Sequence, residues 1–381
     1  MKAIGSLIEL NPMHKGHIYF ASEVKKQCDA LVGVMSGPLV QRGEFAILDK
    51  WTRARIALEH GFDLILELPQ YFVLQSARKF AQGGLMILSL IDDIKGLAFG
   101  LEENTSPKEL EDLLQKIEDE NIQEKIYQEI QKGISYRNSY EKILQTKLYP
   151  NKILALEYLS AKRVYAPSYQ ALVVARKNNY HMTNLDSNPS ATALREAIKE
   201  GKEEEALDFM AKSPSLNMDE LLSKEKIQSP LLFHYFQIAI LMDKITFSSS
   251  GHYEIGMENR LKEAFIKAHS FEEAIQIASN KRHSKARYRR LLMTSLLNFP
   301  KEEISLDALY LRPLAFNEKG KELLKKAKAP IVQKISDRKL SEKQERLFCI
   351  DKKAQELYEY LIGSQEKMDF QQKFFYPQKK D

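Results

Sequence analysis

Two histidines, His14 and His17, flank Gly16 where an apolar run gives way to a helical pattern. The run AIGSLIEL is typical of a buried strand, and GHIYFASEVKKQC is typical of a helix. A helix N-terminus offers unpaired N–H groups and a positive dipole end to an anion. A spacing of three residues places both imidazoles on one side of the first helical turn. We therefore expect a nucleoside triphosphate here, with the histidines donating hydrogen bonds to its phosphate oxygens as charge develops.

Two other interpretations of the histidine pair stay open. The pair could bind a metal ion, although no third Cys, His or carboxylate stands nearby at a ligand-like spacing. The histidines could also be ordinary polar residues at a helix start. Phosphate binding is favoured because Pro12 fixes the loop, and because Gly16 carries no side chain to keep a phosphate from the backbone.

A second group of polar residues stands in the segment SATALR, where Ser190 and Thr192 precede Arg195. Hydroxyls at a helix start, followed by an arginine one turn on, would hold the β and γ phosphates. A helix N-cap alone would also explain Ser190 and Thr192.

The elements that must position these groups alternate between strand and helix. Strands are predicted at 3–10, 30–35, 63–68, 96–100 and 169–176, and helices at 16–28, 49–60 and 75–90. Near-continuous apolar strands separated by helices indicate βαβ units and a parallel sheet that is buried on both faces. Ligands of such a sheet bind outside the carboxyl ends of the strands, where the histidine turn falls.

The chain of 381 residues is long enough for two domains. We predict an α/β domain over 1–205, with a helical insertion at about 107–163 and a last helix from Ser190 or Thr192 to Gly201. An α-helical domain is predicted over 215–381, where no strand series is evident. No apolar run approaches the ~20 residues of a membrane span. The start of the chain lacks a secretory pattern, and Cys28 and Cys349 form no metal-type spacing. These features predict a reduced cytoplasmic protein.

The net charge of +5 is modest, but one segment, NKRHSKARYRRLL, is strongly basic. Its cations, with no acidic residue between them, are Lys281, Arg282, Lys285, Arg287, Arg289 and Arg290. They could contact the phosphates of an RNA backbone, or they could form a solvated helix face.

The HxGH turn resembles the motif of the nucleotidylyltransferase superfamily, which includes the class I aminoacyl-tRNA synthetases. SATALR is similar to the superfamily's second motif. The segments ELNPMHKGH, VQRGEFAILDKWTRARIAL, LAFGLE, NKILALEYL and KRHSKARYRRLLMTSLLN resemble the bacterial tRNA(Met) cytidine acetate ligase family, in the same order along the chain. The resemblance implies an α/β fold, with a Rossmann-like nucleotidylyltransferase domain followed by a mostly α-helical, tRNA-binding C-terminal domain.

The resemblance also implies a two-step reaction. Acetate and ATP would give acetyl-adenylate, and the acetyl group would pass to the exocyclic amine of the wobble cytidine of elongator tRNA(Met). The catalytic residues would be His14, His17 and Arg195. By resemblance, ATP would contact Leu7, Ile8, Glu9, Leu10, Asn11, Pro12, Met13, His14, Lys15, Gly16, His17, Ile18, Tyr19, Phe20, Gly100, Asn151 and Arg176, with phosphate contacts at Ser190 and Thr192. Without the resemblance, a turn glycine, a capping asparagine and a surface arginine would explain Gly100, Asn151 and Arg176 equally well.

Further polar and charged residues follow the second strand and fall at the ligand edge of the sheet. Gln41, Arg42 and Lys50 could hold acetate or tRNA phosphates. Alternatively, Asp49 caps a helix with Lys50 and Arg53 on its solvated face, and Trp51 packs in the core. The resemblance favours tRNA as the partner of the basic segment.

A cofactor and two alternative functions complete the expectations from the sequence. Mg²⁺ is expected from triphosphate chemistry, but the sequence identifies no protein ligand for it. The runner-up functions are a small-molecule nucleotidylyltransferase that makes a dinucleotide coenzyme, and a non-catalytic, nucleotide-sensing RNA-binding protein. The sequence predicts neither the acetate site nor the oligomeric state.

Overall fold

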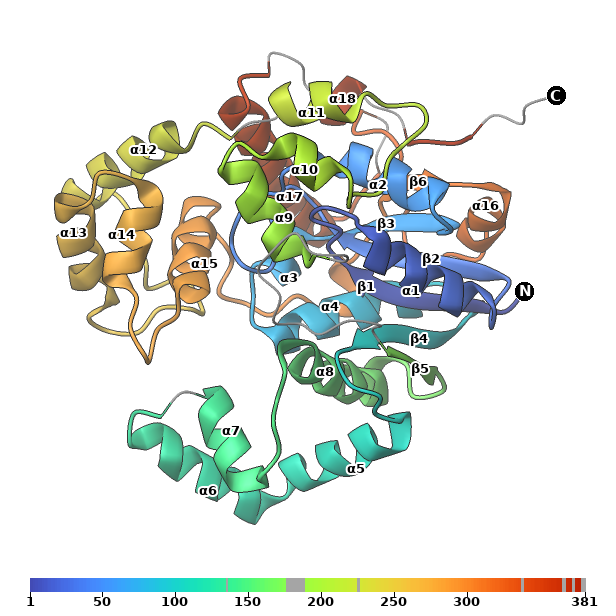
Figure 1. Ribbon diagram of the computed structural model, residues 1–381, viewed down its shortest axis with the longest axis horizontal. Helices are drawn as coiled ribbons and strands as arrows, with labels where there is room; N and C mark the ends of the chain where they lie inside the picture. The colour runs from blue at the N-terminus through green and yellow to red at the C-terminus, as the bar shows by residue number, and fades with distance from the viewer. Residues whose placement is uncertain are drawn as a thin grey trace.

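A twisted sheet runs through the centre of the molecule in a computed structural model (Figure 1). The structure describes residues 1–134, 136–175, 189–224, 227–336, 339–364, 368–371 and 374–377. Within these residues the sheet has six strands in the order β5-β4-β1-β2-β3-β6. The strands are β1 (Ala3–Ile8), β2 (Ala30–Ser36), β3 (Leu64–Leu68), β4 (Ile94–Leu101), β5 (Gln170–Ala175) and β6 (Pro313–Phe316).

Five of these strands form the predicted parallel sheet. β1 pairs with β2 from Ala3 opposite Ala30 to Ile8 opposite Met35, and β4 pairs in parallel with both β1 and β5. Each strand lies within two residues of its predicted range at either end. The predicted α/β fold with a parallel sheet is therefore confirmed.

One strand comes from the C-terminal half of the chain. β6 pairs antiparallel with β3, with Phe316 opposite Leu64 and Ala315 opposite Ile65. The sequence indicates no strand there, because the run PLAF is only four residues long and begins with a proline, which weakens a strand pattern. The C-terminal half thus completes the sheet that the N-terminal half begins.

Eleven described helices up to residue 224 lie between the strands or follow β5. They are α1 (Lys15–Lys25), α2 (Lys50–Glu59), α3 (Gln70–Val73), α4 (Ala77–Ser89), α5 (Pro107–Glu118), α6 (Glu120–Gln131), α7 (Tyr136–Leu144), α8 (Pro150–Tyr165), α9 (Ala191–Lys199), α10 (Glu203–Leu207) and α11 (Met218–Lys224). Asp49 caps α2, and Ser190, rather than Thr192, caps α9. Gly61 and Gly201 take the left-handed backbone expected just past a helix end, with φ of 106° and 79°.

The remaining helices follow residue 228. They are α12 (Ser229–Leu241), α13 (Met257–Lys267), α14 (Phe271–Ala278), α15 (Lys285–Leu296), α16 (Glu318–Leu324), α17 (Glu342–Leu361) and α18 (Met368–Gln371), with a 3-10 turn at Leu306–Ala308. Figure 1 shows α12 to α15 gathered at one side of the sheet, and α16 at the opposite side.

The core occupies both faces of the sheet. Successive residues of a strand point to opposite faces, so Leu31 and Met35 of β2 pack with α1 and α2, whereas Val32 and Val34 join the cluster that includes α4 and α8. This second cluster continues into α12–α15 and α17. Among the described residues, no helix is long and apolar enough to cross a membrane.

Candidate active site

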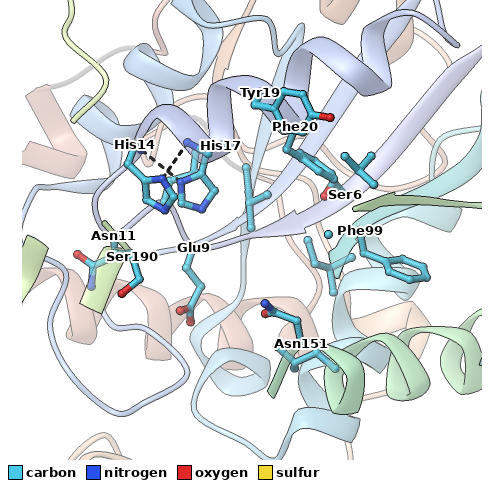
Figure 2. A pocket seen from close by; sticks show the side chains of 18 of the residues that line it. Ser6, Glu9, Asn11, His14, His17, Tyr19, Phe20, Phe99, Asn151 and Ser190 are labelled. Atoms are coloured by element: carbon cyan, nitrogen blue, oxygen red, sulfur yellow. Dashed lines mark hydrogen bonds between the residues drawn. The ribbon is translucent and has the colours of Figure 1, made fainter. Parts of the chain in front are cut away.

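A cavity of about 370 Å³ opens at the carboxyl ends of β1, β4 and β5 (Figure 2). The turn from β1 into α1 forms one wall, and α8 and the start of α9 form others. The predicted residues that line it are Leu7, Ile8, Glu9, Leu10, Asn11, His14, Lys15, Gly16, His17, Tyr19, Phe20, Gln41, Gly100, Asn151, Ser190 and Arg195. The structure thus brings together residues from five separate stretches of the chain.

Some predicted nucleotide contacts lie elsewhere. Pro12, Met13 and Ile18 do not line the cavity, and Met13 is buried in the core beneath α1. Thr192 is also absent from the cavity wall, and its hydroxyl accepts a hydrogen bond from Arg195 Nη2 at 3.2 Å. Arg176 lies outside the described residues.

The histidine pair forms a reciprocal cap at the start of α1. His14 is the N-cap residue, and its Nδ1 accepts the Gly16 N–H at 3.0 Å. His17 Nδ1 accepts the His14 N–H at 3.3 Å. The ring centroids are 4.1 Å apart, and Figure 2 shows the two rings side by side. Because each Nδ1 accepts a backbone proton, each neutral ring carries its proton on Nε2. Nε2–H is then the donor that each ring can offer to a phosphate oxygen.

Gly16 is required by the position of the His14 ring. A Cβ at residue 16 would lie 2.7 Å from His14 Cε1 and 3.0 Å from His14 Nδ1. The ring could not fold back over the helix start with any other residue there. The sequence predicts that the missing side chain of Gly16 leaves space for a ligand. In the structure, the His14 ring also occupies part of that space.

Arg195 holds the loop that leads into the histidine turn. Its Nη1 donates to the carbonyl oxygens of Asn11 at 2.7 Å and Ala191 at 3.1 Å, and the residue is 8% exposed. Burial lowers the pKa of the Arg195 guanidinium; Glu44 opposes this effect, and the positive charge of Arg42 adds to it. Arg42 is exposed beside Gln41, so two cations stand close enough to act on each other at this side of the cavity. Such a pair favours a polyanionic ligand.

Two asparagines on the cavity wall carry donors without protein partners. Asn11 is 3% exposed; its Oδ1 accepts from Ile47 N–H at 2.9 Å, whereas its Nδ2 is buried with no hydrogen-bond partner among the described residues. Asn151 Nδ2, at the start of α8, is also buried and has no hydrogen-bond partner among the described residues. An unpaired buried donor costs about 1–3 kcal/mol. Donors left unpaired on a cavity wall therefore indicate a bound ligand.

The structure corrects the assignment of Lys50. The side chain is 0% exposed, and its Nζ lies 2.9 Å from Glu67 Oε1 and 3.0 Å from Asp369 Oδ1. Arg312 joins this buried group through Asp369, with Nη2 and Oδ2 3.0 Å apart. Lys50 therefore cannot contact acetate or tRNA, and it is not on a solvated helix face either.

Arg53 is likewise buried, although the structural alternative placed it in solvent. It is 1% exposed, and its Nη1 donates to the Glu9 carbonyl oxygen at 2.7 Å. Its Nε donates to the Leu48 carbonyl oxygen at 3.0 Å. Trp51 packs in the core as predicted.

The basic segment becomes α15 and the turn before it, and four of its six cations have protein partners. Arg282 pairs with Glu254 at 2.9 Å. Arg287 pairs with Glu254 at 2.7 Å, and Arg289, 8% exposed, pairs with Glu44 at 2.8 Å and with Glu272. Arg290 Nη1 donates to the Gln41 carbonyl oxygen at 3.1 Å. The expectation that Arg289 and Arg290 face RNA is corrected, because Arg289 is buried against Glu44 and Glu272 and Arg290 donates to a backbone carbonyl of the loop at Gln41. Arg287 is partly exposed and shares Glu254 with Arg282. Lys281, Arg282 and Lys285 are exposed.

Sequence reasoning missed the segment after α10 that covers the histidine turn. Lys15 N–H donates to the Phe209 carbonyl oxygen at 3.3 Å, and Ala211 N–H donates to the Met13 carbonyl oxygen at 2.9 Å. Lys15 Nζ also lies 5.0 Å from the centre of the Phe209 ring. The run DFMAKS carries no motif, so nothing in the sequence signals this contact.

Four aromatic side chains line one part of the cavity, and only one of them, Phe20, was predicted from the sequence. Phe80, Phe99 and Tyr158 line it together with Phe20, and the Phe99 and Tyr158 ring centroids are 5.9 Å apart. Phe80, Phe99 and Tyr158 come from α4, β4 and α8. This apolar surface can hold a flat base, while the histidines and Arg195 face the polar end.

Comparison with known proteins places this geometry in a family. A family model described as HIGH Nucleotidyl Transferase matches residues 1–373. The chain belongs to the HIGH nucleotidyl transferase family. The family model matches the C-terminal helices as well as the sheet, so the assignment does not depend on the short HxGH turn alone.

Named relatives of this HIGH nucleotidyl transferase cover nearly its whole length. The tRNA(Met) cytidine acetate ligase of Thermoanaerobacter sp. (strain X514) is 33% identical over 393 residues, which span 94% of this chain and 95% of that protein. The protein of the same name from Acetivibrio thermocellus is 33% identical over 370 residues, or 88% of this chain and 89% of its own length. The resemblance predicted from the sequence is therefore confirmed.

Solved structures agree with these relatives. The structure of Thermotoga maritima TmcAL bound with alpha-thio ATP covers 99% of both chains at 27% identity, with a TM-score of 0.83. The apo form of the same protein gives a TM-score of 0.84 at 26% identity. The likeness includes the C-terminal helices and is not confined to the sheet.

Proposed function

We propose that this HIGH nucleotidyl transferase is an ATP-dependent acetate ligase that acetylates the wobble cytidine of elongator tRNA(Met) to N4-acetylcytidine. The observation that carries the proposal is the histidine turn, where the tautomers of His14 and His17 place Nε2–H at a helix N-terminus that lines the same cavity as Arg195. The names of its relatives support acetate and the tRNA cytidine as the other two substrates.

In the first step an acetate oxygen attacks the α-phosphorus of ATP and pyrophosphate leaves. Negative charge grows on the phosphate oxygens, and the two Nε2–H groups and the helix dipole stabilise it. Arg195 holds the Asn11 carbonyl oxygen, so it keeps the turn in place beside the phosphates. The adenine base fits the aromatic surface of Phe99 and Tyr158, where Asn151 Nδ2 is available to a ring nitrogen.

In this proposal a magnesium ion would bind to the phosphates of ATP and not to a dedicated protein site. Among the described residues, no group of three or more His, Cys, Asp or Glu side chains could hold a metal ion. Mg²⁺ keeps several waters and commonly binds through substrate phosphates. It would neutralise phosphate charge there, and the protein residues do the positioning described above.

The tRNA substrate requires a cationic surface beside the cavity. The exposed cations that support it are Arg42, next to the cavity residue Gln41, and Lys281, Arg282 and Lys285 before and at the start of α15, of which Arg282 pairs with Glu254. A tRNA substrate also favours a cytoplasmic location.

Pyrophosphate exchange tests the proposal. The purified protein should exchange labelled pyrophosphate into ATP only when acetate is present, and it should transfer labelled acetate to elongator tRNA(Met). Exchange that required a nicotinamide or pantetheine phosphate instead of acetate would favour a coenzyme-forming nucleotidylyltransferase. ATP binding without pyrophosphate release under any of these conditions would favour a nucleotide sensor.

A further inference from the structure

Glu9 places a carboxylate inside a cavity that otherwise suits anions. It follows directly on β1 and lines the cavity, and Figure 2 shows its side chain between the histidine pair and Asn151. Oε1 accepts the Gln41 N–H at 2.6 Å. Oε2 has no hydrogen-bond partner in the described part of the chain.

The backbone around this carboxylate is held firmly. The buried guanidinium of Arg53 donates to the Glu9 carbonyl oxygen at 2.7 Å and is itself held by the carbonyl oxygens of Leu48 and Gly37. Gln41, which orients Oε1, is in turn held by Arg290 at its carbonyl oxygen. Glu9 is therefore positioned from both sides, and Oε2 is the atom left for a substrate.

The chemistry of the substrates limits what Oε2 can bind. ATP, acetate and pyrophosphate are anions that a carboxylate repels. A carboxylate only accepts hydrogen bonds, so its partner must be a donor. The donors among the reactants are sugar hydroxyl groups and the exocyclic amines of adenine and cytosine. The proposed function places the adenine at the aromatic surface of Phe99 and Tyr158, beside Asn151, so the cytosine amine is the donor left for Glu9 at the reacting end of the cavity. Accepting from the N4 amine is the usual way in which Glu and Asp recognise cytosine, whereas uracil presents a carbonyl oxygen at that position.

We propose that Glu9 binds the N4 amine of the acceptor cytidine and is the general base of the acetyl-transfer step; this rests on the proposed function. The amine nitrogen attacks the carbonyl carbon of acetyl-adenylate and forms the C–N bond. The bond between that carbon and the phosphate oxygen breaks, and AMP leaves with the electron pair. The proton lost by the amine passes to Glu9 Oε2 and then to water. The same carboxylate selects cytidine over uridine.

Glu9→Gln is the sharpest variant, because glutamine keeps an Oε1 acceptor for the Gln41 N–H and removes the base. Two rates are measured in the full-length protein: acetate-dependent pyrophosphate exchange, and single-turnover transfer from enzyme-bound acetyl-adenylate to tRNA. We expect the ratio of transfer rate to exchange rate to fall about 10²-fold or more, the usual contribution of a general base. Glu103→Gln is the matched control, since Glu103 pairs with Lys152 outside the cavity at 3.0 Å and should keep the ratio within about twofold.

Two results would overturn the inference. If exchange and transfer fell by the same factor, Glu9 would act on ATP, at its adenine amine, at its ribose or through a metal ion. If neither rate fell, the carboxylate would have no part in the reaction. A wild-type protein without acetate-dependent exchange would instead overturn the proposed function, so the two failures are distinguishable.

A second measurement uses binding and does not depend on turnover. The affinities for tRNA with cytidine and with uridine at the acceptor position are compared in both proteins. A glutamine amide can donate to the uracil carbonyl oxygen, so the preference for cytidine should shrink about tenfold or more in Glu9→Gln. An unchanged preference in a folded variant would count against recognition of the amine by Glu9.

Discussion

Arg290 donates a hydrogen bond from Nη1 to the carbonyl oxygen of Gln41, 3.1 Å away, and so ties α15 to the loop that borders the active site. Burial lowers the pKa of Arg290 to about 10, with a smaller effect from the charge of Arg287, so it stays protonated at neutral pH. The approach is close, because a Cβ on Gly43 (φ +74°) would lie 2.8 Å from Arg290 N. Helix α15 therefore positions the loop of Gln41 and Gly43 beside the active site through a hydrogen bond and close packing.

His17→Ala should lower acetate-dependent pyrophosphate exchange by about 10²-fold or more. The substitution removes a donor aimed at developing phosphate charge, and it also removes the acceptor of the His14 N–H. The measurement is the exchange rate at saturating ATP and acetate. His269→Ala, which truncates an exposed histidine outside the cavity, should behave as wild type. Near-normal exchange in His17→Ala would remove the histidines from the mechanism.

Reversing the exposed charges at Lys281, Arg282 and Lys285 to glutamate should weaken tRNA binding. Each lost phosphate contact should reduce the slope of log K against log salt by about 0.7–0.9, because fewer counterions are released. The affinity is measured over a series of salt concentrations. The matched control reverses three exposed lysines in and directly after α16, on the opposite side of the molecule (Figure 1): Lys319, Lys321 and Lys325. If both triple variants lost equal affinity and slope, a specific RNA surface at α15 would be refuted.

Asp369→Ala should lower the free energy of unfolding by about 3–5 kcal/mol, because it leaves Lys50 and Arg312 as buried, underpaired cations. Burial opposes ionisation of Asp369, but Lys50 and Arg312 outweigh it and hold the pKa of this carboxyl below its usual value. Its contribution is therefore present above the pKa of an unfolded aspartate and is lost as the pH falls through the lower folded value. Urea denaturation measures the change. Asp307→Ala, at an exposed ion pair with Lys343, should leave the urea midpoint unchanged. An equally unchanged midpoint in Asp369→Ala would mean that this network contributes nothing.

His252 should make stability depend on pH between about 6.5 and 4. Burial lowers its pKa to about 4, the charges of Arg290 and Arg287 add to this, and its ring Nε2 lies 2.7 Å from the Leu74 carbonyl oxygen. Below the unfolded pKa of about 6.5, the unfolded chain binds a proton that the folded chain does not, so stability declines until pH 4. The loss over this window is on the order of 3 kcal/mol.

Thermal or urea unfolding over this pH range compares the wild type with His252→Gln. The variant should lose part of the decline, because its side chain does not titrate. A decline of the same size in both proteins would assign the pH dependence to other groups.

The elements around the histidine turn could be predicted because their signals are local. The apolar runs of β1 and β2 and the position of Gly16 before a helical pattern all lie within short stretches. The side-chain roles of Ser190 and Asp49 as helix caps also depend on neighbours two or three residues away. Local patterns of this kind need no knowledge of the fold.

The partners of the charged residues could not be predicted in the same way. Arg289 meets Glu44, and Lys50 meets Asp369, across 245 and 319 residues of chain. A sequence shows how many charges a helix carries, but burial depends on which other element packs against it. The surface assigned to RNA was therefore partly wrong, although the helix itself was predicted.

The antiparallel strand β6 has a consequence for synthesis of the protein. Until residue 316 has emerged from the ribosome, β3 has an uncovered edge with unpaired backbone groups, which invites pairing with another chain. A gene truncated after residue 205 would leave that edge bare permanently. We expect such a fragment to precipitate when expressed, so the nucleotide-binding half cannot be obtained alone by cutting at the predicted boundary.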